Sequence, residues 1–177
     1  MLVQSRRIPV FVSCPSDLTD EQKKSEEVVM ALLEENRLIR CTLGKDDFPV
    51  DTPLSEVFGM IRRCSGAVVL GFRQFHAPSG VFKAGTSAVR TEDKDVYMPT
   101  PWNQLEGGMI FALNLPTLIF REAGISGGIF DMGNQDAFVH GMPPGDTLEP
   151  GQEVVKEKYS VLFQRWSHRV GINYYAR

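Results

Sequence analysis

Short apolar runs alternate along this chain with longer segments in which apolar residues recur every three or four positions. Four runs have the length and composition of strands, at residues 8–13, 38–43, 66–71 and 117–120. Three segments have helical spacing and lie between or after these runs, at residues 19–36, 52–63 and 100–114. Because strands and helices alternate, the order predicts a parallel sheet with right-handed crossovers and helices on both faces.

We therefore expect a single α/β domain over residues 1–177, with a flavodoxin-like, doubly wound sheet of about five parallel strands. Two connections, 72–99 and 121–150, are long for a compact domain and are predicted to be functional covers or loops without regular structure. A final helix is expected over residues 151–170. Its predicted apolar face consists of Val154, Val155, Tyr159, Leu162, Phe163 and Trp166.

Two predicted helices have start signals in the sequence. Thr19 with Gln22 can form a capping box at the start of the helix over residues 19–36, and the helix over residues 100–114 has a cap and a proline. Thr100 can cap it through its side-chain oxygen, and Pro101 suits the first helical position, where an N–H group is not needed. Leu105, Met109 and Ala112 follow the helical period, so we expect them to face the sheet.

This helix also carries the candidate chemistry. Glu106 comes four residues after Trp102 and three after Asn103, which predicts that the three side chains are neighbours near the positive end of the helix dipole. An alternative is that Glu106 is a solvated residue that complements the dipole and that Trp102 only packs. Gly107 and Gly108 oppose this alternative, because a mid-helix glycine costs about 1 kcal/mol relative to alanine and indicates close approach of a strand or a ligand.

Ligands of doubly wound sheets bind at the carboxyl ends of the strands, where the strand order reverses. The loops after the first and third predicted strands lie at this edge, as does the segment that leads into the Trp102 helix. We therefore place five further candidate residues there, in addition to Trp102, Asn103 and Glu106. They are Ser13, Cys14, Asp17, Phe72 and Arg73.

Composition narrows the function classes. The net charge of −3 provides no basic field for nucleic-acid phosphates. There is no apolar run long enough to cross a membrane and no secretory signal, so a cytoplasmic location is predicted. The three cysteines are scattered, which argues against a metal site or a disulfide framework. Glycine-rich phosphate fingerprints of the dinucleotide or P-loop type are absent.

The segment from Trp102 to Leu118 resembles a known motif. Its order Trp-Asn-Gln-Leu-Glu-Gly-Gly, then Ala112-Leu-Asn-Leu-Pro-Thr-Leu, is similar to the Glu-x-Gly…Ala…Pro pattern of nucleoside 2-deoxyribosyltransferases. It also resembles the related TIR-like (Toll/interleukin-1 receptor-like) nucleotide-cleaving domains of bacterial immunity. The resemblance implies that Glu106 is catalytic and that the target is an N-glycosidic bond. It further implies a homo-oligomer.

Two departures from the transferase pattern favour the NAD-cleaving TIR-like domains over the transferases. Trp102-Asn103 stands where transferases carry Asp-Gly-Thr, and Ser13-Cys14-Pro15 replaces a glycine-rich turn. An aromatic ring suits stacking on a cationic base, so we expect an NAD glycohydrolase or ADP-ribose cyclase of an anti-phage domain, with NAD as substrate and no other cofactor. The alternatives are a nucleoside 2-deoxyribosyltransferase or a nucleoside 5′-monophosphate N-glycosidase. A non-catalytic module that binds a nucleotide signal or self-assembles is an alternative of another class.

Overall fold

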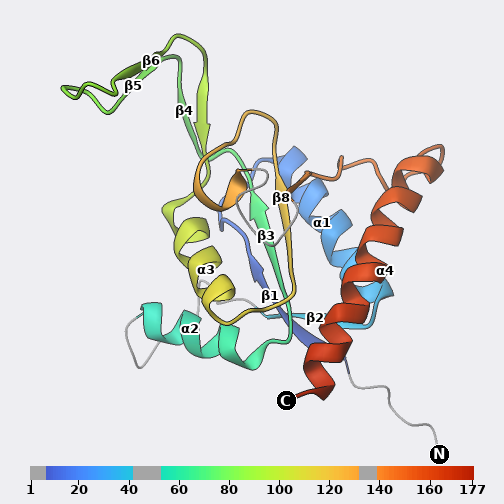
Figure 1. Ribbon diagram of the computed structural model, residues 1–177. Coiled ribbons are helices and arrows are strands. Elements are labelled where there is room, and N and C mark those ends of the chain that lie inside the picture. Colours follow the sequence, from blue (N-terminus) through green and yellow to red (C-terminus); the bar gives the residue numbers. More distant parts are fainter. Residues whose placement is uncertain (1–6, 42–52, 132–138) are drawn as a thin grey trace, which may run out of the picture.

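Five parallel strands form the central sheet, in the order β2-β1-β3-β8-β9 (Figure 1). The computed structural model describes residues 7–41, 53–131 and 139–177. The strands are β1 (Ile8–Ser13), β2 (Leu38–Cys41), β3 (Ala67–Gly71), β8 (Thr117–Arg121) and β9 (Val139–Gly141). The chain adds β2 on one side of β1 and β3 on the other, which confirms the predicted flavodoxin-like fold and puts the switch point between β1 and β3.

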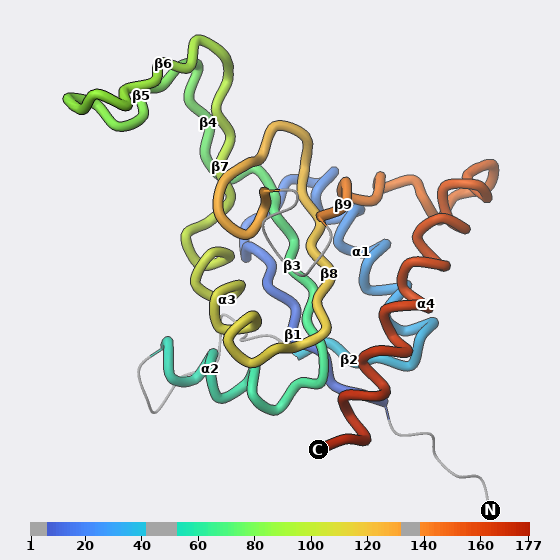
Figure 2. The backbone as a smooth tube through the Cα atoms, viewed as in Figure 1, coloured from blue at the N-terminus to red at the C-terminus, as the bar shows by residue number. Residues whose placement is uncertain are grey.

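Helices cover both faces of this sheet, as the alternation predicted (Figure 2). The helices are α1 (Asp20–Glu35), α2 (Pro53–Arg63), α3 (Pro101–Ala112) and α4 (Glu153–Tyr175), with a short 3₁₀ helix η1 (Gly128–Phe130). Successive residues of β1 point to opposite faces. Val10 and Val12 therefore pack with α1 and α4, whereas Phe11 packs with α2 and η1. The same alternation turns Ser13 toward the face that α3 covers.

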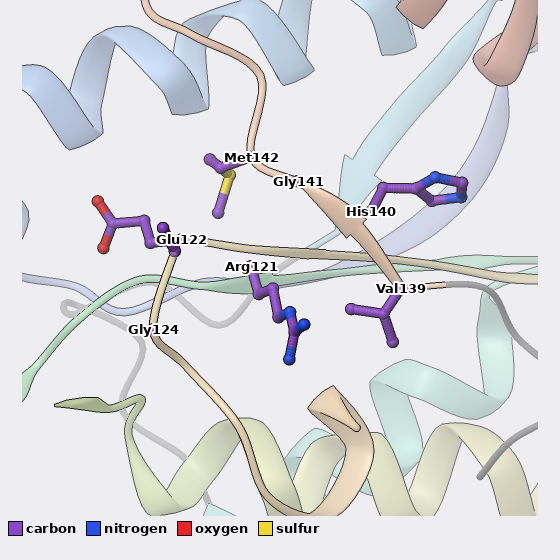
Figure 3. A pocket seen from close by; sticks show the side chains of 8 residues that line it. Arg121, Glu122, Gly124, Val139, His140, Gly141 and Met142 are labelled. Atoms are coloured by element: carbon purple, nitrogen blue, oxygen red, sulfur yellow. The ribbon is translucent and has the colours of Figure 1, made fainter. Parts of the chain in front are cut away.

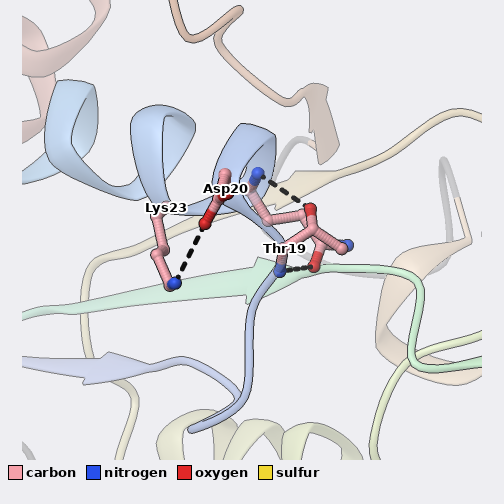
Figure 4. A network of polar contacts seen from close by, with 4 residues as sticks. Thr19, Asp20 and Lys23 are labelled. Carbon is pink, nitrogen blue, oxygen red and sulfur yellow. Dashed lines mark hydrogen bonds and ion pairs between the residues drawn. The ribbon is translucent and has the colours of Figure 1, made fainter.

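Two predicted helix starts are confirmed. Thr19 accepts a hydrogen bond from the Gln22 backbone N–H at 3.2 Å, and the Gln22 side chain accepts one from the Thr19 N–H at 3.1 Å. This capping box satisfies two N–H groups of α1, and Lys23 pairs with Asp20 beside it (Figure 4). Thr100 caps α3 by accepting from the Asn103 N–H at 3.3 Å.

The predicted helix exit at residue 114 is also confirmed. Asn114 adopts a left-handed conformation with φ of 52°, directly after the cap residue of α3. Two details of the other predicted elements lie outside the described residues. These are Thr52, at the expected start of α2, and residues 42–43, at the end of the second predicted strand.

The long connection 72–99 has regular structure, contrary to the prediction of a loop without it. It contains two antiparallel ladders, in which β4 pairs with β7 and β5 with β6. The bounds of these strands are Phe75–Ala77, Gly80–Phe82, Arg90–Glu92 and Val96–Met98. Figure 1 shows this segment as an arm that projects from the sheet edge. Period-two patterning over three residues is too short to distinguish such strands from loop.

In the second long connection, 121–150, the residues on either side of 132–138 are described, and apolar side chains there pack on the core. Ile129 and Phe130 are buried in the core between α2, α3 and the sheet. Residues 139–141 form the fifth strand, β9, which pairs with β8 in parallel. This strand was not located from the sequence, because three residues give no usable period.

The buried face of α3 differs from the predicted one. Met109 packs against the core as predicted, but Leu105 is 50% exposed and Ala112 is exposed. The buried residues of α3 are Asn103, Gly107 and Ile110. Periodicity alone favoured the apolar residues. The structure buries Asn103 because its amide is hydrogen-bonded, and it buries Gly107 because Ile129 packs on it, with a distance of 2.5 Å from the Ile129 Cδ1 atom to the place of a Cβ.

The C-terminal helix runs from Glu153 to Tyr175, beyond the predicted 151–170. Tyr159, Phe163 and Trp166 are buried as predicted, but Val154 is 86% exposed in the first turn. The next residue, Val155, packs against the core, so Val154 faces solvent on the other side of the first turn. Within residues 7–41, 53–131 and 139–177, no helix is both long and apolar enough to cross a membrane.

We expect Gly71→Ala to lower the free energy of unfolding by about 1–3 kcal/mol, the usual cost of overpacking a core. A Cβ at this position would clash with the ring of Phe130, which is fully buried and has no space into which to move. Chemical denaturation would measure the loss. The control is Gly171→Ala on α4, where a Cβ meets no atom and alanine favours the helix. Equal stability of the two variants would contradict the prediction.

Candidate active site

A buried hydrogen bond joins α3 to the carboxyl end of β1. Asn103 and Ser13 are each 1% exposed, and the Asn103 Nδ2 group donates to the Ser13 Oγ atom at 2.8 Å. The same amide approaches the Leu70 carbonyl at 3.5 Å, and the Thr100 hydroxyl donates to the Asn103 Oδ1 atom at 3.0 Å. Both ends of the Asn103 amide are therefore hydrogen-bonded. These bonds also fix the first turn of α3.

Glu106 is the charged group that this arrangement positions. Because Asn103 donates to the Ser13 oxygen, the Ser13 hydroxyl proton is available for a carboxylate, and Ser13 hydrogen-bonds the Glu106 side chain. Burial raises the pKa of Glu106 above its ordinary value of 4.5, and the Ser13 hydrogen bond partly offsets this rise. A desolvated carboxylate of this kind interacts strongly with nearby positive charge.

Trp102 lies on the solvent side of α3. Its side chain is 44% exposed and belongs to neither core cluster. The alternative that Trp102 is a core packing residue is therefore wrong. The three candidate side chains of α3 do not share one face as predicted, because Asn103 points inward, Trp102 points outward and Glu106 lies half-buried between them.

Two of the predicted candidates are packed away from solvent. Phe72 is fully buried in the core beneath α1 and α4, so its side chain is not at the sheet edge. Cys14 is half-buried, and burial, followed by the nearby charge of Glu26, raises the pKa of its thiol to about 12. Cys14 is therefore a neutral thiol at physiological pH and a poor nucleophile.

Arg73 takes part in a network that the sequence did not reveal. Its guanidinium donates to the Ala123 carbonyl through Nε at 2.8 Å and also through Nη2. Its backbone N–H donates to the Glu122 carboxylate at 2.5 Å, and Gln22 donates to the same Glu122 oxygen at 3.0 Å. The network links α1, β3 and β8 at the carboxyl edge of the sheet. Among the residues of this network, only Gln22 could be given a role from its neighbours in the sequence, as part of the capping box of α1.

The base of the projecting arm rests on this network. The Arg73 guanidinium lies 4.1 Å from the centre of the Tyr97 ring, and the His76 ring stacks on Tyr97 with a centroid distance of 4.9 Å. His76 is also 2.9 Å from an Asp95 oxygen. This pair lowers the pKa of Asp95. The arm therefore leaves the sheet edge in a fixed direction near the candidate site.

Two hollows flank the Arg73–Glu122 network. One, of about 420 Å³, lies at the β1/β3 switch point and is lined by Ser16, Asp17, Leu18, Thr19, Gln22, Lys23, Arg73 and Gln74. The other, of about 450 Å³, lies where β8 and β9 end and is lined by Arg121, Glu122, Ala123, Gly124, Val139, His140, Gly141 and Met142 (Figure 3). Asp17, a predicted candidate, is thus exposed in the first hollow.

The described residues contain no group of three or more side chains that could hold a metal ion. His140 lines the second hollow, where burial lowers its pKa and favours the neutral ring. No family model, curated protein or solved structure matches this chain.

We expect Ser13→Ala to raise the pKa of Glu106 further, because the hydroxyl stabilises the ionised carboxylate. The side-chain carboxyl shift of Glu106, followed by NMR across a pH series, measures this directly. Ser16→Ala is the control, since the Ser16 hydroxyl is exposed and bonds Asp17 instead. An unchanged or lower Glu106 pKa in Ser13→Ala would show that the hydroxyl does not hold the carboxylate.

Proposed function

We propose that this chain cleaves the N-glycosidic bond of a nucleotide, with NAD as the substrate and Glu106 as the catalytic carboxylate. The observation that carries the proposal is the position of Glu106, a half-buried carboxyl group held by Ser13 beside the switch point of a flavodoxin-like sheet. The resemblance of the Trp102–Leu118 segment to glycosidic-bond-cleaving enzymes supports the same role for this glutamate.

The chemistry needs a carboxylate and little else. In NAD the bond between ribose C1′ and the nicotinamide nitrogen breaks, and its electron pair stays on that nitrogen. Nicotinamide therefore leaves as a neutral molecule without needing an acid. The ribose becomes an oxocarbenium-like cation, which a carboxylate stabilises electrostatically or captures covalently. Water then adds to C1′ and loses a proton, which gives ADP-ribose.

The neighbouring side chains suit supporting roles. Ser13 is a positioning residue, because it is buried and hydrogen-bonds Glu106, and Asn103 acts through its hydrogen bond to Ser13. Trp102 offers an accessible indole one helical turn before Glu106, where it can stack on a flat base. Stacking on a cationic ring favours nicotinamide over the neutral bases of deoxynucleosides.

The hollows at the sheet edge favour a substrate longer than a nucleoside. Both lie at carboxyl ends of strands, one on each side of the Gln22–Glu122 hydrogen bond. A dinucleotide has a second nucleoside and two phosphates beyond the bond that breaks, and the hollows, which are not lined by Glu106 or Trp102, would take these distal groups. In this arrangement Asp17 and Arg73 lie near the distal part of the substrate rather than near the reacting bond.

Incubation of the purified protein with NAD, and separately with pairs of deoxynucleosides and bases, tests the proposal. Products are separated by chromatography. Free nicotinamide with ADP-ribose or its cyclic form supports the proposed reaction. Base exchange between deoxynucleosides would instead identify a transferase. Binding heat without any product would point to a nucleotide-binding module.

We expect Glu106→Gln to lower turnover by about 100-fold or more, because a neutral amide cannot stabilise the developing charge. The fold should persist. Folding raises the pKa of Glu106, so the protonated side chain stabilises the folded state. This contribution is fully present below pH 4.5 and is lost as the pH rises through the pKa of the folded state. The variant should therefore match or exceed the parent in stability at neutral pH. Turnover within about tenfold of the parent, roughly 1.4 kcal/mol of barrier, would disprove the assignment.

We expect Trp102→Ala to raise the KM for NAD by about 3- to 30-fold, which corresponds to loss of a stacking contact of roughly 0.5–2 kcal/mol. Trp102→Phe should retain most of the affinity because a flat ring remains. Thermal unfolding should barely change in either variant, since the indole is partly exposed and lies outside the core. Steady-state kinetics and melting curves on the same samples separate the two effects. An unchanged KM in Trp102→Ala would remove Trp102 from the site.

A further inference from the structure

Two of the three cysteines meet in the part of the core that α2 covers. Cys64 follows α2 and is fully buried, and Cys41 ends β2 and packs against the same core cluster. The Cys64 thiol is hydrogen-bonded to the Cys41 thiol, so the two sulfur atoms are in contact. Both thiols are free in this structure. The third cysteine, Cys14, packs against the other core cluster, on the opposite face of the sheet.

Strand register explains why two residues 23 positions apart come together. Cys41 pairs with Phe11 of β1, so both side chains point to the face that α2 covers. On the other side of β1, the Ser65 N–H donates to the Pro9 carbonyl at 2.9 Å, which holds the residues after α2 against β1. Helix α2 crosses this face of the sheet between β2 and β3, and its end therefore brings Cys64 to Cys41.

We infer that Cys41 and Cys64 form a disulfide in the folded protein when a peroxide oxidises it, and that a thiol reductant reverses the reaction. Because the two thiols already touch, the bond requires a closer approach of the sulfur atoms and no movement of distant segments. The inference does not rest on the proposed reaction, because neither cysteine belongs to the candidate active site.

The surroundings of the two thiols set the order of the steps. Cys41 is partly exposed and can meet a peroxide, whereas Cys64 is fully buried. Burial, followed by the neighbouring Cys41, raises the pKa of the Cys64 thiol to about 12, so this thiol stays protonated at neutral pH. Cys41 is therefore oxidised first, and Cys64 completes the bond.

Hydrogen peroxide supplies the oxidising equivalents for both steps. The Cys41 sulfur attacks one peroxide oxygen, the O–O bond breaks, and the leaving hydroxide takes the Cys41 proton as water. Cys41 is then a sulfenic acid. The Cys64 sulfur attacks the Cys41 sulfur, and the hydroxide that leaves takes the Cys64 proton as a second water. Two thiols and one hydrogen peroxide thus give one disulfide and two water molecules.

The bond would join the two ends of the crossover that carries α2, the helix that packs beside α3 (Figure 1). Such a link restricts the unfolded chain, so the oxidised protein should melt roughly 5–10 °C above the reduced protein. Thermal unfolding with and without reductant measures this shift. A lower melting temperature after oxidation would mean that the bond strains the fold, and would overturn the inference that the folded protein accommodates it.

Peptide mapping by mass spectrometry, after treatment of the folded full chain with hydrogen peroxide, tests the inference directly. We expect the bond between Cys41 and Cys64 to be at least tenfold more abundant than any bond to Cys14, and dithiothreitol should restore the thiols. The control is the same reaction in concentrated urea. There Cys14 and Cys41, which are 27 positions apart, should pair about as often as Cys41 and Cys64, because the two loops are similar in length.

Three variants test the order of the steps. Cys64→Ala should trap Cys41 as a sulfenic acid that dimedone labels, since no thiol remains to displace the hydroxide. Cys41→Ser should leave the buried Cys64 unmodified, and the matched control Cys14→Ser should form the bond as the parent does. Folded protein in which Cys41 and Cys64 both remain thiols after peroxide treatment would overturn the inference. Pairing with Cys14 as frequent as in urea would also overturn it.

Discussion

The hydrogen bond between the Asn103 amide and the Ser13 hydroxyl is the contact on which the candidate site depends. It joins two residues 90 positions apart and lies in the buried layer between α3 and β1. Removing one partner would leave the other unsatisfied in the interior, at a cost of about 1–3 kcal/mol. Because the Ser13 oxygen accepts this bond, its hydroxyl proton remains available for Glu106. Fold stability and the placement of the carboxylate thus share one interaction.

A second set of contacts fixes the rest of the sheet edge. Glu122 at the end of β8 accepts hydrogen bonds from Gln22 on α1 and from the Arg73 backbone after β3. Arg73 in turn stacks on Tyr97 at the base of the arm. Three elements and the arm are therefore positioned by a single carboxylate, and the two hollows lie on either side of it. These contacts fix where the loops after β3 and β8 and the base of the arm lie relative to the sheet.

Local signals predicted the strand and helix order well, because caps such as Thr19 and Thr100 act within one turn. These signals failed to predict features that depend on contacts between residues far apart in the sequence. Asn103 is buried through a bond to Ser13, and Gly107 through contact with Ile129, so the apolar period misassigned the inner face of α3. Phe72 was expected at the edge but belongs to the core. Glu106 could be selected from its motif, whereas the role of Glu122 depends on two segments far away in sequence.

A crystal structure of the Glu106→Gln variant with bound NAD tests the central claim most directly. The account predicts that C1′ of the nicotinamide ribose lies in van der Waals contact with the side chain at position 106. It also predicts that the nicotinamide ring lies against Trp102 and that the adenosine half extends along the carboxyl edge of the sheet. NAD bound with its nicotinamide ribose away from position 106, or no NAD bound at saturating concentration, would contradict the account.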